Sequence, residues 1–121
     1  MKQSIIPMTQ NDPKTSDLTA LKALFGPIFE NSPAQTVYLF GSRARGDAAP
    51  ESDVDLIIVA DTSRPFVERC KDFFGLLGAC PAPVEMLVYM PEEFRSMRER
   101  ENPLVMKALE EGKLLYERSV H

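Results

Sequence analysis

The first part of the chain carries apolar residues at the spacing of one helix face. Ser16 precedes them and is a good N-cap, so a helix is predicted from there, which the Gly26-Pro27 pair ends or bends. Residues 1–14 are polar, contain two prolines and are predicted to be irregular. The apolar positions of the helix are Leu18, Leu21, Phe25 and Ile28.

Three later runs of β-branched, aromatic and aliphatic residues predict strands. They are Thr36–Phe40, Asp53–Ala60 and Pro83–Tyr89, with a turn and a loop over residues 41–52 between the first two. Both faces of the second run are apolar beyond its two aspartates, which is typical of a central strand covered on both sides. Lys113–Glu117 is predicted as a short edge strand.

Prolines and glycines mark the ends of the remaining predicted helices. One helix is expected over Pro65–Gly78 and another over Pro91–Arg100, and Asn102-Pro103 separates the latter from a last helix that ends at Gly112. This order of elements predicts an α/β (α+β) fold, with a small mixed sheet of three to five strands and helices packed on it. A length of 121 residues suits one domain over residues 1–121.

Charge and hydropathy exclude several functions. The formal charge of −4, from 14 basic and 18 acidic residues, argues against direct binding of a nucleic-acid backbone, which needs a basic face. No run approaches the roughly 20 apolar residues of a membrane span, and no signal peptide is recognised, so a cytoplasmic protein is expected. Cys70 and Cys80 are expected to be reduced, and His121, the only histidine, is a poor candidate for catalysis at the chain end.

Paired carboxylates open the second predicted strand. Side chains at positions i and i+2 of a strand point to the same side, so Asp53 and Asp55 converge. Their mutual repulsion is relieved by a bridging cation, and oxygen ligands favour Mg²⁺ or Mn²⁺ over zinc. On its own, an Asp-x-Asp pair is a weak signal.

The Gly41-Ser42 turn precedes these carboxylates by ten residues. Glycine at a strand end lets the backbone approach phosphate oxygens, and the amides that follow are expected to face an anion. Ser42 adds a hydroxyl donor, while Arg43 and Arg45 add two guanidinium groups. The turn is therefore predicted to bind the phosphates of a nucleoside triphosphate.

Glu85 is an acidic residue within the otherwise apolar third strand. Burying it is costly unless it is paired or binds a metal, so it is a candidate third carboxylate. The alternative is an edge strand whose glutamate faces water.

Gly41-Ser42, ten residues, and Asp53-x-Asp55 together resemble the signature of the DNA polymerase beta-like nucleotidyltransferase superfamily. The strings Leu-Phe-Gly-Ser-Arg-Ala-Arg-Gly at 39–46 and Ser-Asp-Val-Asp-Leu at 52–56 look like its smallest branch, the minimal nucleotidyltransferases (MNT domains). The resemblance runs from the first predicted helix to residues 112–116, and its later parts match only weakly.

This resemblance implies a polymerase beta-like fold with Asp53, Asp55 and Glu85 as catalytic carboxylates that bind two Mg²⁺ ions. It implies that Gly41, Ser42 and the backbone through Arg43 bind the triphosphate, with Arg45 on its phosphates. The donor would be ATP, and the acceptor would be a tyrosine of a partner, a helical HEPN toxin that the MNT protein neutralises as its antitoxin by adding AMP.

Two alternatives remain open at this stage. The protein could be an inactive binding module that neutralises its partner by contact alone, although its intact set of carboxylates argues against this. It could also be a small-molecule (antibiotic) nucleotidyltransferase, although those enzymes carry a second domain for the drug. Self-association is possible, and the base preference is not fixed by the sequence.

Overall fold

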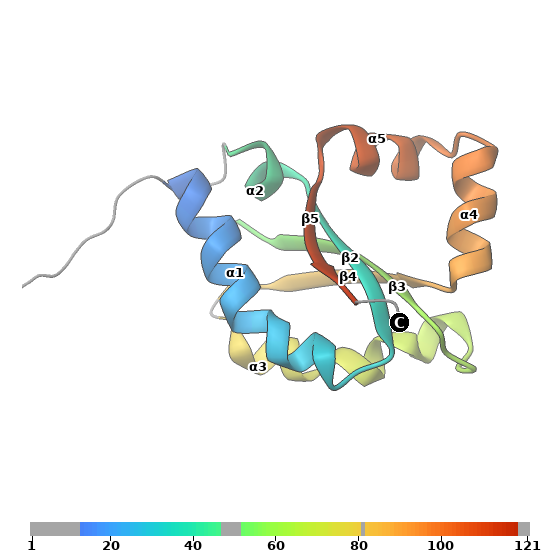
Figure 1. Ribbon diagram of the computed structural model, residues 1–121, viewed down its shortest axis with the longest axis horizontal. Coiled ribbons are helices and arrows are strands. Elements are labelled where there is room, and N and C mark those ends of the chain that lie inside the picture. Colours follow the sequence, from blue (N-terminus) through green and yellow to red (C-terminus); the bar gives the residue numbers. More distant parts are fainter. Residues whose placement is uncertain (1–12, 47–51, 81, 119–121) are drawn as a thin grey trace, which may run out of the picture.

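A mixed β-sheet forms the centre of the computed structural model, which describes residues 13–46, 52–80 and 82–118 (Figure 1). Within these residues the strand order is β4-β3-β2-β5. The pair β3–β4 is parallel, and the other two pairs are antiparallel. The predicted mixed sheet is confirmed, with bounds β2 Ala34–Phe40, β3 Val54–Ala60, β4 Val84–Tyr89 and β5 Lys113–Glu117.

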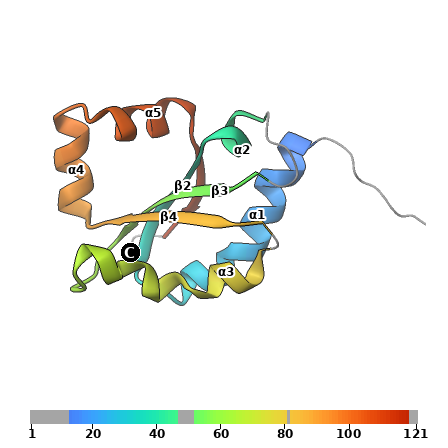
Figure 2. The ribbon, with the colours of Figure 1, turned by 180° about the vertical axis from the view of Figure 1, so that it is seen from behind.

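Helices cover both faces of this sheet (Figures 1 and 2). Side chains from α1, the 3-10 helix η2 and α3 pack on one face, and side chains from α4 and α5 pack on the other. No helix in the described part of the chain is long and apolar enough to cross a membrane. The bounds are α1 Pro13–Glu30, α2 Ser42–Arg45, η2 Phe66–Phe73, α3 Gly75–Ala79, α4 Pro91–Glu99 and α5 Pro103–Glu111.

Strand β3 lies inside the sheet, between β4 and β2, and is buried on both faces. Leu56 and Ile58 point into the core beneath α1 and α3, whereas Ile57 and Val59 point toward α4 and α5. This alternation follows from the two-residue period of a strand. The predictions of a covered central strand and of an edge strand at Lys113–Glu117 are both confirmed.

The break between α4 and α5 follows the predicted capping residues. The Asn102 side chain accepts hydrogen bonds from the amides of Leu104 at 3.0 Å and Val105 at 3.3 Å, so it caps α5. Pro103 and Pro91 are the first residues of α5 and α4, where a missing amide hydrogen costs nothing.

Of the two outcomes predicted at Gly26-Pro27, an end or a bend, the end is wrong, because helix α1 continues through Pro27 to Glu30. Phe25 and Phe29 lie on either side of the proline and are both fully buried, so core packing outweighs the local preference to stop. The carbonyls at the helix end are then bonded by Arg118, whose Nη2 donates to the oxygens of Phe29 and Ser32 at 2.9 and 2.8 Å. The predicted start at Ser16 is also wrong, since α1 begins at Pro13.

The single helix predicted over Pro65–Gly78 is also wrong, because this segment forms η2 and then the short helix α3. In a 3-10 helix, side chains three residues apart lie above one another. Phe66 and Arg69 are spaced in this way, and the guanidinium carbon lies 5.5 Å from the ring centroid. The tighter helix thus directs Arg69 inward, where only 6% of it is exposed.

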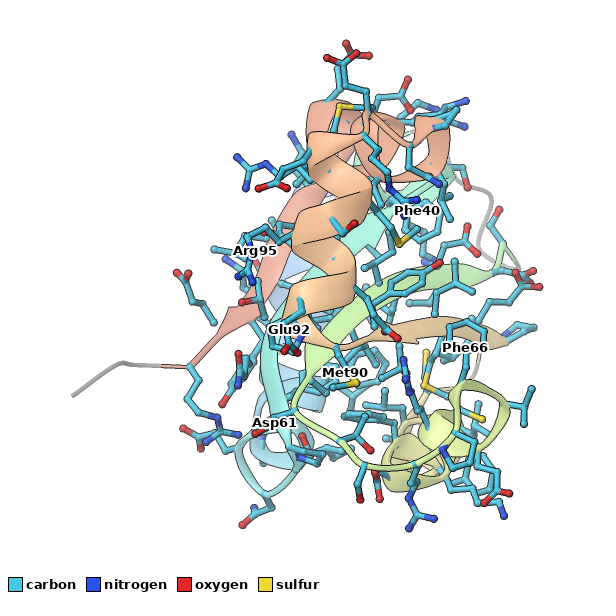
Figure 3. All side chains as sticks on the ribbon, turned by 90° about the vertical axis from the view of Figure 1, so that its right-hand side faces the viewer. Phe40, Asp61, Phe66, Met90, Glu92 and Arg95 are labelled. Carbon is cyan, nitrogen blue, oxygen red and sulfur yellow. The ribbon has the colours of Figure 1, made fainter. Side chains whose placement is uncertain are left out.

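Buried Arg69 is neutralised from α4. Its two terminal nitrogens donate to the Glu93 carboxylate at 2.6 and 3.1 Å, and Nη1 also donates to the Val88 carbonyl at 3.3 Å. Glu93 in turn accepts a hydrogen bond from the Met90 amide at 2.8 Å, at the start of α4. Met90 and, across from it, Phe66 are labelled in Figure 3. The hydrogen bonds from Arg69 are the main cause that lowers the pKa of Glu93, and the Met90 amide adds to it.

We expect Glu93→Gln to destabilise the protein at pH 7 by about 1–2 kcal/mol, because a charge-assisted bond to buried Arg69 is weakened while the partly exposed site limits the loss. The folded-state pKa lies below the ordinary value of 4.5, so the carboxylate stabilises the fold above that pH and the benefit disappears on acidification. Urea denaturation at a series of pH values checks this. Glu92→Gln, on the same helix, is the matched control, and a Glu93→Gln effect that persists at pH 3 would contradict the assignment.

Candidate active site

The register between β3 and β4 brings the predicted carboxylates together. The parallel pairing sets Asp55 directly beside Glu85, and Asp53 lies two residues earlier, on the same side of the chain. One oxygen from each of these three side chains lies within 4.8 Å of the others. This cluster, Asp53, Asp55 and Glu85, is called the carboxylate triad below.

The triad lies at an accessible end of the sheet, where β3 and β4 begin. Glu85 is exposed on edge strand β4, as the water-facing alternative predicted, and it nevertheless lies beside the two aspartates. Asp53 is exposed and Asp55 is half-buried. A ligand can therefore reach all three carboxylates from outside.

The pKa of Asp55 reflects the close approach of the three carboxylates. Its partial burial is the main cause that raises the pKa of its carboxyl group, and the negative charges of Glu85 and then Asp53 raise it further. Like charges at this separation favour a cation among them. Three carboxylate oxygens are hard ligands, so the residues present fit Mg²⁺ or Mn²⁺.

Gly41 brings the end of β2 against this triad. In the antiparallel pair β2–β3, Phe40 lies opposite Asp55, and the chain turns immediately after it. Gly41 has φ 78° and ψ −159°, a backbone conformation that residues other than glycine rarely adopt. A β-carbon at this position would also overlap the Asp55 carboxylate. For both reasons, the fold requires glycine at this position.

Ser42 begins the single helical turn α2 directly after Gly41. The Gly41 carbonyl accepts bonds from the amides of Ala44 and Arg45, both at 3.1 Å, and Gly46 closes the turn with its amide on the Ser42 carbonyl at 2.9 Å. The amides of Ala44 and Arg45 thus donate hydrogen bonds within the turn. The expectation that the amides after Gly41 face an anion is therefore wrong for these two residues. Ser42 itself is half-buried beside Gly41.

Arg43 connects the turn to the strand that carries the aspartates. Its guanidinium donates to the Ser52 carbonyl from Nε at 3.1 Å and from Nη2 at 2.8 Å. Ser52 immediately precedes Asp53, so this contact fixes the approach of the chain to the triad. The structure thus gives Arg43 a positioning contact, and its role in phosphate binding stays a prediction.

Arg45 lies on the other side of the turn and faces α5. Its Nη1 is 3.5 Å from Glu111 Oε1, in an ion pair whose side chains are 41% and 32% exposed. These two residues line a pocket of about 270 Å³. Its other lining residues are Phe40, Gly41, Leu104 and Lys107.

The sequence pattern singled out neither Lys107 nor Glu111. Both lie on the polar side of a correctly predicted helix, so periodicity alone gave no reason to select them. The spacing of 104, 107 and 111 on α5 does place them along one side of that helix, and this is the signal that was present.

A sequence model of the family described as "Polymerase beta, Nucleotidyltransferase" matches residues 26–121. Since this match spans most of the chain, the protein belongs to the polymerase beta nucleotidyltransferase family. The resemblance read from Gly41-Ser42 and the Asp-x-Asp pair is confirmed at the level of the family and the fold.

Solved structures share this fold. A toxin–antitoxin structure with AMP-PNP matches at 20% identity and a TM-score of 0.60, covering 81% of this chain and 74% of the other. A protein from Sulfolobus solfataricus assigned as a nucleotidyltransferase matches at 20% identity and a TM-score of 0.55, covering 93% and 94%. A tri-AMPylated HEPN toxin from Shewanella oneidensis in complex with an MNT antitoxin matches at 18% and 0.50, covering 87% and 73%. No curated relative matches the sequence.

We expect Gly41→Ala to destabilise the protein by about 1–3 kcal/mol and to abolish Mg²⁺ binding, because the added methyl group strains the turn and displaces Asp55. Thermal unfolding with and without Mg²⁺ measures both effects. Gly26→Ala is the matched control, since a β-carbon at Gly26 meets nothing within 4 Å, and this change should be neutral or slightly stabilising. Equal behaviour of the two variants would contradict the role given to Gly41.

Asp55→Asn should raise the thermal midpoint of the metal-free protein at pH 7, because it removes an ionised group whose pKa the fold raises. Since the folded carboxyl holds its proton to higher pH than the unfolded one, the difference from wild type should shrink as the pH falls toward the ordinary value of 3.8 and be absent below it. Mg²⁺ should raise the midpoint of wild type but not of Asp55→Asn. Asp61→Asn, beyond the other end of β3, should retain the Mg²⁺ effect.

Proposed function

We propose that this protein is a Mg²⁺-dependent nucleotidyltransferase that moves AMP from ATP to a hydroxyl group of a partner protein. The partner is a helical HEPN toxin, the acceptor is a tyrosine, and the transfer makes this protein the antitoxin. The convergence of Asp53, Asp55 and Glu85 beside the Gly41 turn is the observation that supports this proposal most strongly.

In the reaction, the acceptor oxygen forms a bond to the α-phosphorus of ATP while the bond from that phosphorus to the bridging oxygen of the β-phosphate breaks. Pyrophosphate leaves, and the proton of the acceptor hydroxyl passes to a carboxylate. Glu85 suits this last role because it is exposed at the sheet edge, where an acceptor can approach.

The other residues of the site bind and orient the donor. Gly41 lets the phosphates approach the backbone, and the Ser42 hydroxyl donates to a phosphate oxygen. Arg45 supplies positive charge for the leaving pyrophosphate. Asp53, Asp55 and Glu85 would hold the divalent cation, which neutralises phosphate charge and polarises the α-phosphorus when it is bound.

The toxin–antitoxin neighbours support the choice of partner. One of them contains AMP-PNP, and another contains an AMPylated HEPN toxin with its MNT antitoxin. The described residues leave the triad at an open end of the sheet, where an acceptor group from another molecule can reach it. An open arrangement of this kind gives a large acceptor such as a protein room to approach the triad.

The test is incubation of the protein with Mg²⁺, ATP and its HEPN partner, followed by mass spectrometry of the partner. We expect a tyrosine to gain AMP, and Asp53→Asn or Asp55→Asn to slow this reaction by about 10²- to 10³-fold or more. Asp61→Asn, which removes a carboxylate far from the triad, should react like wild type. Neutralisation of the toxin that survives both triad substitutions without any adduct would replace the transferase by the contact-only alternative.

A further inference from the structure

The pocket between the Gly41 turn and α5 lies next to the triad but contains residues that the nucleotidyltransferase motif does not include. Phe40 and Gly41 form its wall on the side of β2, and Asp55 lies opposite Phe40 in the sheet. Leu104, Lys107 and Glu111 form its wall on α5. Any group that extends from the triad past Gly41 toward α5 therefore meets these side chains.

Two features of the sequence hold α5 in this place. Val105 and Ala108 are buried against Ile57 and Val59 of β3, which turns the side of α5 that bears Lys107 toward the pocket. At the helix end, a β-carbon on Gly112 would overlap the carbonyls of Ala108 and Leu39. Gly112 thus lets α5 end directly against β2, close to Phe40.

The charges of the pocket favour an anion. Arg45 and Lys107 face the cavity with one carboxylate, Glu111, and that carboxylate is paired with Arg45. Lys107 makes no ion pair within the part of the chain that the structure describes. The apolar side chains of Phe40 and Leu104 lower the local dielectric, which strengthens the attraction between Lys107 and a bound phosphate.

We propose that Lys107 binds the terminal phosphates of the nucleoside triphosphate in this pocket, and that Glu111 competes with those phosphates for Arg45. The proposal rests on the proposed function and adds two residues of α5 to its donor site. Before the donor binds, Arg45 is held by Glu111 in a weak, half-exposed ion pair. When the donor binds, Arg45 exchanges Glu111 for phosphate oxygens, and Lys107 contacts the same phosphates from the opposite wall.

This model predicts opposite effects from two substitutions in one pocket. Lys107→Gln should weaken ATP binding by about tenfold, because a charged hydrogen bond to phosphate is lost. Glu111→Gln should strengthen it by about two- to fivefold, because Arg45 no longer has to leave a carboxylate. Lys107→Arg should restore most of the binding, since it keeps the charge.

Isothermal titration calorimetry of the full chain with ATP and with AMP, each in excess Mg²⁺, tests the model. AMP lacks the terminal phosphates, so its binding should not depend on residue 107 or 111. Lys71→Gln on η2 and Glu110→Gln on α5 are the matched controls, and both should bind ATP like wild type. Thermal unfolding of each variant checks that these exposed substitutions leave the fold intact.

Failure of this inference can be told apart from failure of the proposed function. ATP binding to wild type that Lys107→Gln leaves unchanged, or an equal loss of AMP binding, would overturn the role of Lys107 while the proposed transferase stands. If Glu111→Gln binds ATP no more tightly than wild type does, the competition between Glu111 and the phosphates for Arg45 is overturned. If wild type binds no ATP at all, the proposed function fails and this inference fails with it.

Discussion

Asp55 and Glu85 lie side by side across β3 and β4, and this register keeps two like charges together that would otherwise separate. A shift of the pairing by one residue would turn the β4 side chain to the opposite face of the sheet. The buried side chains of β3 prevent such a shift, because they are packed on both faces. The packing of the core thus keeps the two carboxylates side by side despite their mutual repulsion.

The Gly41 turn depends on the same register. Its backbone can approach Asp55 only because Phe40 lies opposite that residue and because Gly41 has no side chain. The triad and the turn are therefore one unit, in which the pairing of three strands sets the distance between a carboxylate cluster and a turn suited to phosphate. Helix α5 extends this unit, because Gly112 has no side chain and lets the helix end lie directly against β2.

The strands and the triad could be predicted because they depend on short-range patterns. A run of aliphatic and β-branched residues located β3, and the two-residue period of a strand placed Asp53 and Asp55 on one side. Glu85 was harder, because an edge position and a place in the triad looked like alternatives in the sequence. The structure shows both, since the edge strand pairs in parallel with β3.

The errors arose where distant contacts override local preference. Gly26-Pro27 signals an end or a bend, and burial of Phe29 carries α1 past this pair without an end. The segment after Pro65 has helical spacing, yet Arg69 is bonded to Val88 and Glu93 from other elements, and a 3-10 helix results. The contact of Arg43 with Ser52 and the place of Lys107 in the pocket also depend on the folded chain, so residue type and motif position do not predict them.

The bonds from Arg43 to Ser52 have a consequence for how this protein can vary. They join the two ends of the connection between the turn and β3, so these ends are held together by a contact outside the connection itself. Extra residues in that connection would cost little entropy, because the cost of loop closure grows only slowly with length. This is a position where evolution or an engineer can insert a new recognition segment next to the reaction centre without rebuilding it.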